Sequence, residues 1–248
     1  MDRELFEAAK RKVIGIDRPR EVIGTLGEKS LHAILKHYFE PFSENHEIKL
    51  GSFFADIVGE DGIMEIQTKA VYRLKEKLTY FLAVSRVTLV IPVIGQRKLM
   101  WIDPESGEVT SGRTTKKGGS LFDALCELGG ISDLLTHRNL SVCVVMLDVC
   151  DYKLLDGRGE RKKLKATKFD RIPENLVEEV YINIPEDYLQ LMPVDFPKNF
   201  TAADMQKFTK KKSRDCYQAI KAMEAAGLCE LAGTRGRSRE YKLTDRKI

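Results

Sequence analysis

A continuous run of apolar, mostly β-branched residues at positions 87–94 constrains the fold of this chain more than any other segment. An uninterrupted run of this length, without strict alternation of polar and apolar residues, is typical of a strand that is covered on both faces. Directly before it, Leu74, Leu78 and Phe81 recur at helical spacing and predict a helix over residues 72–85. The sequence therefore predicts a sheet whose buried strand has helices on both sides.

Three shorter strands are predicted before that helix, at residues 46–50, 53–58 and 63–69. The last two flank residues 59–62, whose sequence Gly-Glu-Asp-Gly favours a tight turn and hence an antiparallel hairpin. A first helix, antiparallel strands, a crossover helix and a buried strand, in this order, predict an α/β/α sandwich with a mixed central sheet.

The segment that follows is less regular. A strand is predicted at residues 140–152 and a short helix at residues 185–192. Between them, residues 158–168 are rich in Lys and Arg and are interpreted as a basic loop, which either follows a phosphate backbone or is simply solvated. No strand is predicted between that loop and the short helix.

Composition argues against several classes of protein. No apolar run of the 248-residue chain approaches the roughly 20 residues that cross a bilayer. The N-terminal sequence Met-Asp-Arg-Glu lacks the basic start and apolar stretch of a signal peptide, so we expect a cytoplasmic protein. The five cysteines are odd in number and form no Cys-x-x-Cys pair, so we expect them to be reduced and mostly buried. The four histidines show no zinc-ligand spacing.

The predicted hairpin brings acidic side chains together. Asp56 lies on its first strand and the tripeptide Glu65-Ile66-Gln67 on its second. Because side chains alternate along a strand, Glu65 and Gln67 share one face. Two carboxylates and an amide are oxygen ligands that suit a hard divalent cation such as Mg²⁺ (or Mn²⁺), which activates water and shields phosphate charge. The alternative is that both acids simply face water beside the turn.

Three segments in order, residues 24–39, 55–58 and 63–69, resemble the helix, Asp strand and Glu-x-Lys strand of the PD-(D/E)XK nuclease superfamily. This is the fold of many restriction endonucleases and of archaeal Holliday-junction resolvases. The resemblance, which covers residues 24–82, implies a restriction-endonuclease-like phosphodiesterase. It also implies that Glu28, Asp56, Glu65 and the backbone carbonyl of Ile66 hold one or two magnesium ions. A surface pairing of Glu28 with His32 or Lys29 is the alternative for that residue.

The chain departs from this pattern at Gln67, where the superfamily usually has lysine. An amide carries no positive charge and takes no proton from water. Lys69 lies two residues further on the same strand face, and Lys75 and Lys77 lie on the following predicted helix. Any of these lysines could supply the missing charge, so the catalytic candidates are Asp56, Glu65, Gln67, Lys69 and Lys77.

Charge divides the chain into a nearly neutral body and a basic tail. Residues 196–248 hold thirteen Lys and Arg against six Asp and Glu, a net charge of +7, whereas residues 1–195 hold 28 against 31. We therefore predict two domains with these bounds, the second binding an acidic polymer.

The tail resembles a winged helix. A helix after Thr201, a lysine turn, a second helix that Ser213 is expected to cap, and two strands around a glycine-bearing basic tip follow in that order. Tyr217 is placed on the apolar seam of the second helix. The resemblance implies contacts to DNA, expected to be double-stranded, by Lys210, Lys211, Lys212, Ser213, Arg214, Gln218, Lys221, Arg235, Arg237 and Arg239. Other winged helices bind protein instead.

Two functional hypotheses follow. The first is a Mg²⁺-dependent DNA endonuclease, in which the tail holds the DNA and the carboxylate site cuts a phosphodiester. The second, favoured by Gln67, is a non-catalytic DNA-binding regulator with a degenerate nuclease fold. The sequence leaves open the substrate structure and the oligomeric state, a homodimer included.

Overall fold

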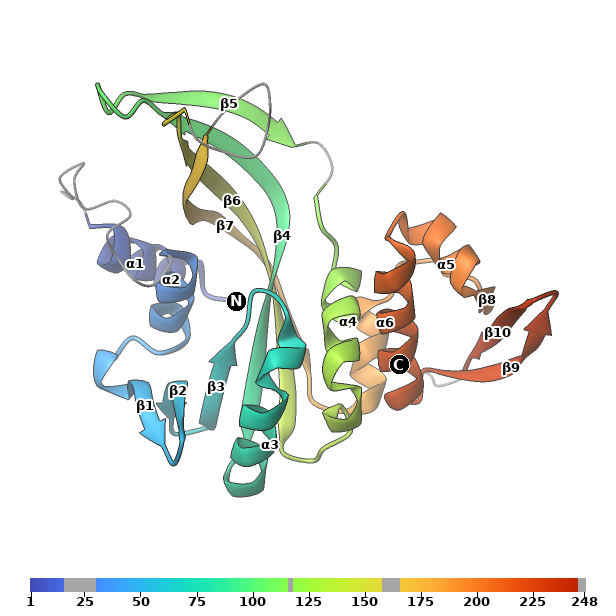
Figure 1. Ribbon diagram of the computed structural model, residues 1–248. Helices are drawn as coiled ribbons and strands as arrows, with labels where there is room; N and C mark the ends of the chain where they lie inside the picture. Colours follow the sequence, from blue (N-terminus) through green and yellow to red (C-terminus); the bar gives the residue numbers. More distant parts are fainter. Residues whose placement is uncertain (16–29, 116–117, 158–165, 245–248) are drawn as a thin grey trace. The chain divides into compact units, whose positions relative to one another are not determined.

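The computed structural model describes residues 1–15, 30–115, 118–157 and 166–244 (Figure 1). The protein is an α/β protein with a mixed, multi-stranded sheet. In the described part of the chain the larger sheet has seven strands in the order β1-β2-β3-β4-β6-β7, with β5 paired to β4. These strands are β1 (His46–Leu50), β2 (Phe53–Gly59), β3 (Gly62–Ile66), β4 (Val87–Ile102), β5 (Val109–Thr115), β6 (Leu140–Leu154) and β7 (Thr167–Ile182).

A smaller three-stranded sheet has the order β8-β10-β9. Its strands are β8 (Asn199–Thr201), β9 (Cys229–Arg235) and β10 (Ser238–Leu243). The α-helices are α1 (Arg3–Ile14), α2 (Ser30–Phe39), α3 (Lys75–Val84), α4 (Phe122–Leu128), α5 (Ala202–Thr209) and α6 (Ser213–Ala225). Segments of 3₁₀ helix are η1 (Ser43–Asn45), η2 (Val71–Leu74), η3 (Gly129–Leu134) and η4 (Pro185–Leu191). Helices of the described residues are all too short to cross a membrane.

The chain forms two compact units. The first comprises residues 1–46, 94–119 and 145–178, and the second comprises residues 47–93, 120–144 and 179–248. In the first unit, α1 begins after Asp2, whose carboxylate accepts a hydrogen bond of 2.9 Å from the amide of Leu5. The buried face of α1 then packs on α2, where the rings of Phe6 and Tyr38 meet edge to face.

The buried strand predicted at residues 87–94 is confirmed as the first half of β4. Leu89 and Val90 are fully buried, and β3 pairs with this stretch in parallel, with Ile63 opposite Val87. The hairpin prediction is also confirmed, because β2 and β3 are antiparallel. The second strand is shorter than predicted, since β3 ends at Ile66 and the chain turns at Ala70, which has a left-handed backbone (φ 56°).

Strand β7 was missed, because no strand was predicted between the basic loop at residues 158–168 and the short helix. It lies at the end of the strand order, as an edge strand. An edge strand tolerates Pro173 and exposed acids such as Glu174, because one side of its backbone needs no partner. These same residues hide its strand character in the sequence. Within the first unit, Arg171 on β7 donates through Nη2 to Asp151 Oδ2 on β6 at 2.8 Å.

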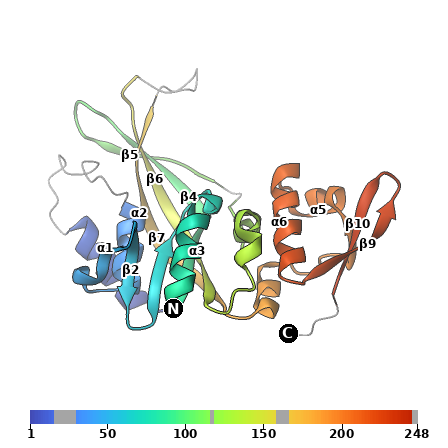
Figure 2. The ribbon, with the colours of Figure 1, turned by 60° about the horizontal axis from the view of Figure 1, so that its bottom comes forward.

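In the second unit, α5 and α6 lie beside the β9–β10 hairpin in both views (Figures 1 and 2). Helix α6 also packs on α4 and on η3. The approach is close at Gly129, where an added Cβ would lie 2.3 Å from the carbonyl oxygen of Gln218. On the other side of η3, a Cβ at Gly130 would lie 2.6 Å from the Cβ of Tyr72. These two glycines therefore let η3 fit between η2 and α6.

Candidate functional site

Asp56 and Glu65 meet across the β2–β3 hairpin. The register pairs Ile57 with Met64, and one step further places Asp56 beside Glu65. There the strands exchange bonds through side chains: the Asp56 amide donates to Glu65 Oε1 at 3.2 Å, and the Ile66 amide donates to Asp56 Oδ2 at 2.7 Å. The Glu65 carboxylate is thus held by the backbone of Asp56, and the Asp56 carboxylate by the backbone of the predicted ligand Ile66.

Lys77 on α3 completes this cluster. Its Nζ lies 2.5 Å from Glu65 Oε2, and the same ammonium group lies 5.7 Å from the ring centroid of Phe81. The side chain of Glu65 is only 1% exposed, whereas that of Lys77 is 17% exposed. Of the lysines proposed to replace the family's strand lysine, Lys77 is the one that reaches the carboxylates.

Burial raises the pKa of Glu65 to about 7. The negative charge of Asp56 acts in the same direction, while the hydrogen bond and charge of Lys77 partly oppose the rise. Near neutral pH this carboxyl group therefore exchanges a proton readily. A buried acid with such a shift, beside a second acid and a lysine, is typical of functional sites.

The donor set suits a hard cation in its chemistry but supplies only part of a coordination shell. Both oxygens of Glu65 accept from protein donors, and so does one oxygen of Asp56. Within residues 1–15, 30–115, 118–157 and 166–244, no three His, Cys, Asp or Glu side chains form a group that could hold a metal ion. Glu28, the third predicted carboxylate ligand, lies outside the described residues. Two carboxylates fit Mg²⁺ or Mn²⁺ only together with a further group.

The remaining catalytic candidates lie just beyond β3. The side-chain amide of Gln67 donates to the backbone carbonyl of Lys69, and its backbone amide donates to the carbonyl of Val90 at 2.9 Å. Gln67 therefore secures the end of β3. The side chain of Lys69 is exposed.

Most of the residues predicted to contact DNA are exposed. These are Lys210, Lys212, Ser213, Arg214, Lys221, Arg237 and Arg239. Two others contact the protein itself, because Lys211 forms an ion pair with Asp123 on α4 and Gln218 lies against Gly129. The expectation that Ser213 caps α6 is wrong, since the N-cap is Lys212 and no side chain caps the helix.

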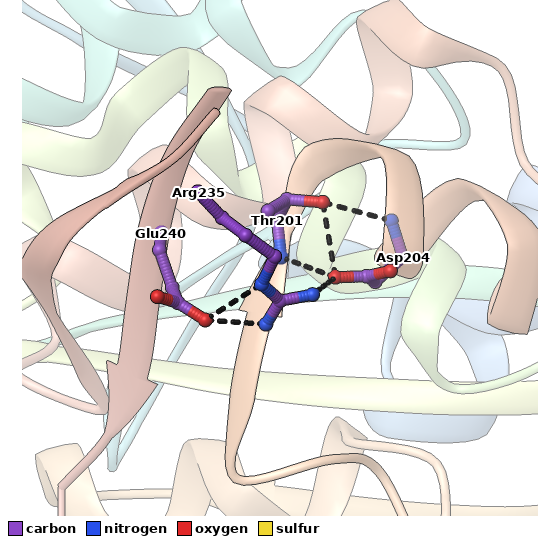
Figure 3. Close-up of polar contacts among 4 residues, drawn as sticks. All are labelled: Thr201, Asp204, Arg235 and Glu240. Carbon is purple, nitrogen blue, oxygen red and sulfur yellow. Dashed lines mark hydrogen bonds and ion pairs between the residues drawn. The ribbon is translucent and has the colours of Figure 1, made fainter. Parts of the chain in front are cut away.

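Arg235, also predicted to contact DNA, lies at the tip end of the β9–β10 hairpin and ties it to the start of α5 (Figure 3). Its Nη1 donates to Asp204 Oδ2 at 2.7 Å, and its Nε donates to Glu240 Oε1 at 2.9 Å. Asp204 in turn forms a capping box with Thr201, whose hydroxyl accepts from the Asp204 amide at 3.2 Å. The hydrogen bond from the Thr201 amide lowers the pKa of Asp204, and Arg235 adds to this effect.

Two exposed tyrosines were not recognised as surface groups. Tyr217, expected on the apolar seam of α6, is 57% exposed, and Tyr72 on η2 is 53% exposed. The sequence spacing could have predicted the exposure of Tyr217. Arg214, Tyr217 and Lys221 are three and four residues apart, so they share one face of a helix, and two of the three are basic.

The fold and the cluster define an α/β protein with paired carboxylates and a lysine at the edge of a hairpin. The family model described as "Domain of unknown function (DUF8091)" matches residues 29–183, and the chain belongs to this family. It is also 28% identical over 221 residues to an uncharacterized protein of Treponema pallidum (strain Nichols), over 89% of this chain and 87% of that protein. No solved structure matches the chain. The family region contains Asp56, Glu65 and Lys77 and ends before β8.

Proposed function

We propose that this protein is a Mg²⁺- or Mn²⁺-dependent DNA endonuclease whose phosphodiesterase site is built from Asp56, Glu65 and Lys77. One observation carries the proposal: these side chains come from β2, β3 and α3 and converge within hydrogen-bonding contact around a buried acid. A buried, unscreened acid pair is costly unless a cation compensates it. Here Lys77 provides part of that compensation, at a place where a divalent cation would provide more.

The chain's own residues divide the work. Asp56 and Glu65 would supply carboxylate oxygens for the cation, and Glu28, which lies outside the described residues, is the third ligand that the resemblance implies. The bound cation would activate water and shield phosphate charge. Lys77 would offset the negative charge that develops on the phosphate oxygens. This is the part that the superfamily's strand lysine plays, and Gln67 cannot play it.

The C-terminal elements would hold the DNA. The strand order β8-β10-β9 with α5 and α6 between β8 and β9 supports a winged-helix interpretation. In that interpretation the exposed residues Arg214 and Lys221 of α6 face the DNA, while Arg237 and Arg239 at the hairpin tip contact phosphates. Arg235 has a different role, since its contacts fix the hairpin on α5.

The second candidate function is a non-catalytic, DNA-binding regulator. It is favoured by one observation, that both oxygens of Glu65 already accept from the protein, from the Asp56 amide and from Lys77. In this case the ion pair is structural, and the DNA-binding elements act alone.

Nicking of a supercoiled plasmid in Mg²⁺ or Mn²⁺, with salt-dependent gel shifts in parallel, separates these functions. We expect Asp56→Asn and Glu65→Gln to abolish nicking and to leave DNA binding nearly intact. Asp61→Asn is the matched control, because Asp61 is an exposed acid in the turn of the same hairpin and should nick as the wild type does. Nicking that persists in either site variant contradicts the proposal. Wild-type protein that binds without nicking establishes the regulator.

A further inference from the structure

A surface of aromatic and basic side chains runs across the second unit from η2 to α6. We name it the Tyr72–Tyr217 surface, and its residues are Tyr72, Arg73, Lys75, Arg214, Tyr217 and Lys221. All six are exposed. More than half of each tyrosine is open to solvent, 53% for Tyr72 and 57% for Tyr217.

Segment η3 makes this surface continuous. Tyr72 contacts η3 at Gly130, and α6 contacts η3 at Gly129. Between them, the Asp133 carboxylate accepts a hydrogen bond of 2.8 Å from Lys75. This bond lowers the pKa of Asp133, and the charge of Lys221 lowers it further by a smaller amount. Lys75 and Lys221 therefore both act on the Asp133 carboxylate, the first through an ion pair and the second through its charge.

The charges and rings of this surface suit one kind of ligand. The guanidinium of Arg73 lies 5.9 Å from the Tyr72 ring centroid, and its Nε donates to the Tyr72 hydroxyl at 3.4 Å, which orients that ring. Four of the six residues are basic, and Asp133 offsets one of their charges, so the surface is net positive even with its internal ion pair. Basic groups that follow a phosphate backbone, interleaved with exposed rings on which bases stack, are the pattern of single-strand nucleic-acid binding.

We propose that the Tyr72–Tyr217 surface binds a single-stranded segment of DNA. The inference rests on the proposed function and names its substrate class: DNA with unpaired bases next to the carboxylate site. In a duplex the base faces are stacked on each other and cannot reach a tyrosine ring, so exposed rings favour an unpaired strand. The surface begins close to the site along the chain, because residues 67–70 join the end of β3 to η2.

Fluorescence anisotropy with a labelled single-stranded oligonucleotide, and with the duplex of the same sequence, tests the inference. We expect Tyr72→Ala and Tyr217→Ala each to weaken single-strand binding roughly tenfold to a hundredfold, and Tyr72→Ala, which lies outside α6, to leave duplex binding little changed. Tyr72→Phe and Tyr217→Phe keep the ring and should bind as the wild type does. Tyr80→Ala is the control, since Tyr80 is an exposed tyrosine on α3 that packs on Phe53 instead. Thermal melting shows that each variant is folded.

The results separate this inference from the proposed function. Alanine variants that bind the single strand like the wild type overturn the inference, and nicking by the same variants would show that the carboxylate site stands. Loss of binding in the Phe variants as well overturns base stacking as the cause. Loss of single-strand binding in the Ala variants alone supports the Tyr72–Tyr217 surface as a binding site. This holds even if neither the wild type nor Asp56→Asn nicks a plasmid, because that result overturns only the proposed phosphodiesterase activity.

Discussion

Replacing Glu65 by Gln should change how the stability of this protein depends on pH. The folded state raises the pKa of Glu65 from its ordinary value of 4.5 to about 7, chiefly through burial. Between these values the folded protein holds a proton that the unfolded chain has lost. The contribution of Glu65 to stability is therefore fully present below pH 4.5, declines as the pH rises, and is lost above about pH 7.

The magnitude follows from the size of the shift. One pKa unit corresponds to about 1.4 kcal/mol, so the rise of the Glu65 pKa corresponds to about 3 kcal/mol of unfolding free energy. Because the side chain of Glu65 is 1% exposed, solvent screens little of this effect. Glutamine has the shape of the protonated acid and does not titrate. The difference in unfolding free energy between Glu65→Gln and the wild type should therefore depend on pH. Between pH 4.5 and pH values above 7, we expect it to shift by about 3 kcal/mol in favour of the variant.

Chemical denaturation of both proteins at several pH values measures this difference. Titrating groups away from the cluster of Asp56, Glu65 and Lys77 act alike in the two proteins, so their contributions cancel in the comparison. Glu105→Gln is a control, since Glu105 is an exposed acid in the turn before β5 and should give a profile parallel to the wild type. Parallel profiles for Glu65→Gln and the wild type would refute the reasoning, as would a wild type that gains stability over the variant as the pH rises.

Three further perturbations test other parts of the structure. Asp56→Asn removes a negative charge that raises the pKa of Glu65, so that pKa should fall, as followed by NMR titration of ¹³C-labelled glutamate carboxyls. Thr201→Ala removes the cap that accepts from the Asp204 amide and should lower the free energy of unfolding by about 1 kcal/mol in chemical denaturation, whereas Thr201→Ser should not. Gly129→Ala forces a Cβ against α6 and should lower that free energy by about 1–3 kcal/mol, seen as a lower melting temperature.

Local patterns were enough to predict much of the second unit. The buried run that became β4 and the glycine-flanked turn between β2 and β3 each have a physical cause within a few residues. The pairing of Asp56 with Glu65 follows from that hairpin, because the register of a short antiparallel turn fixes which residues face each other. These are contacts of low sequence separation, so the sequence specifies them directly.

Contacts between distant segments could not be predicted in the same way. The spacing on α3 does not show that Lys77, rather than Lys75, reaches Glu65, because this depends on how the helix returns across the sheet. The packing of α6 on η3 was equally hidden, and it places Gln218 against Gly129. Edge strand β7 was missed because its polar residues are compatible with a loop.

The energetic cost of Glu65 bears on which function the cluster serves. A purely structural contact between β3 and α3 would be made at least as well by apolar side chains, since a buried ion pair often contributes no net stability over well-packed hydrophobic residues. Here the acid is placed beside a second acid, Asp56, which raises the cost further. A fold that keeps two adjoining carboxylates, one of them buried with a pKa of about 7, loses stability at neutral pH that a cation bound between them would restore. If Mg²⁺ raises the melting temperature of the wild type above pH 7 and leaves that of Glu65→Gln unchanged, the carboxylates serve a cation. A shift common to both proteins would instead favour the structural ion pair.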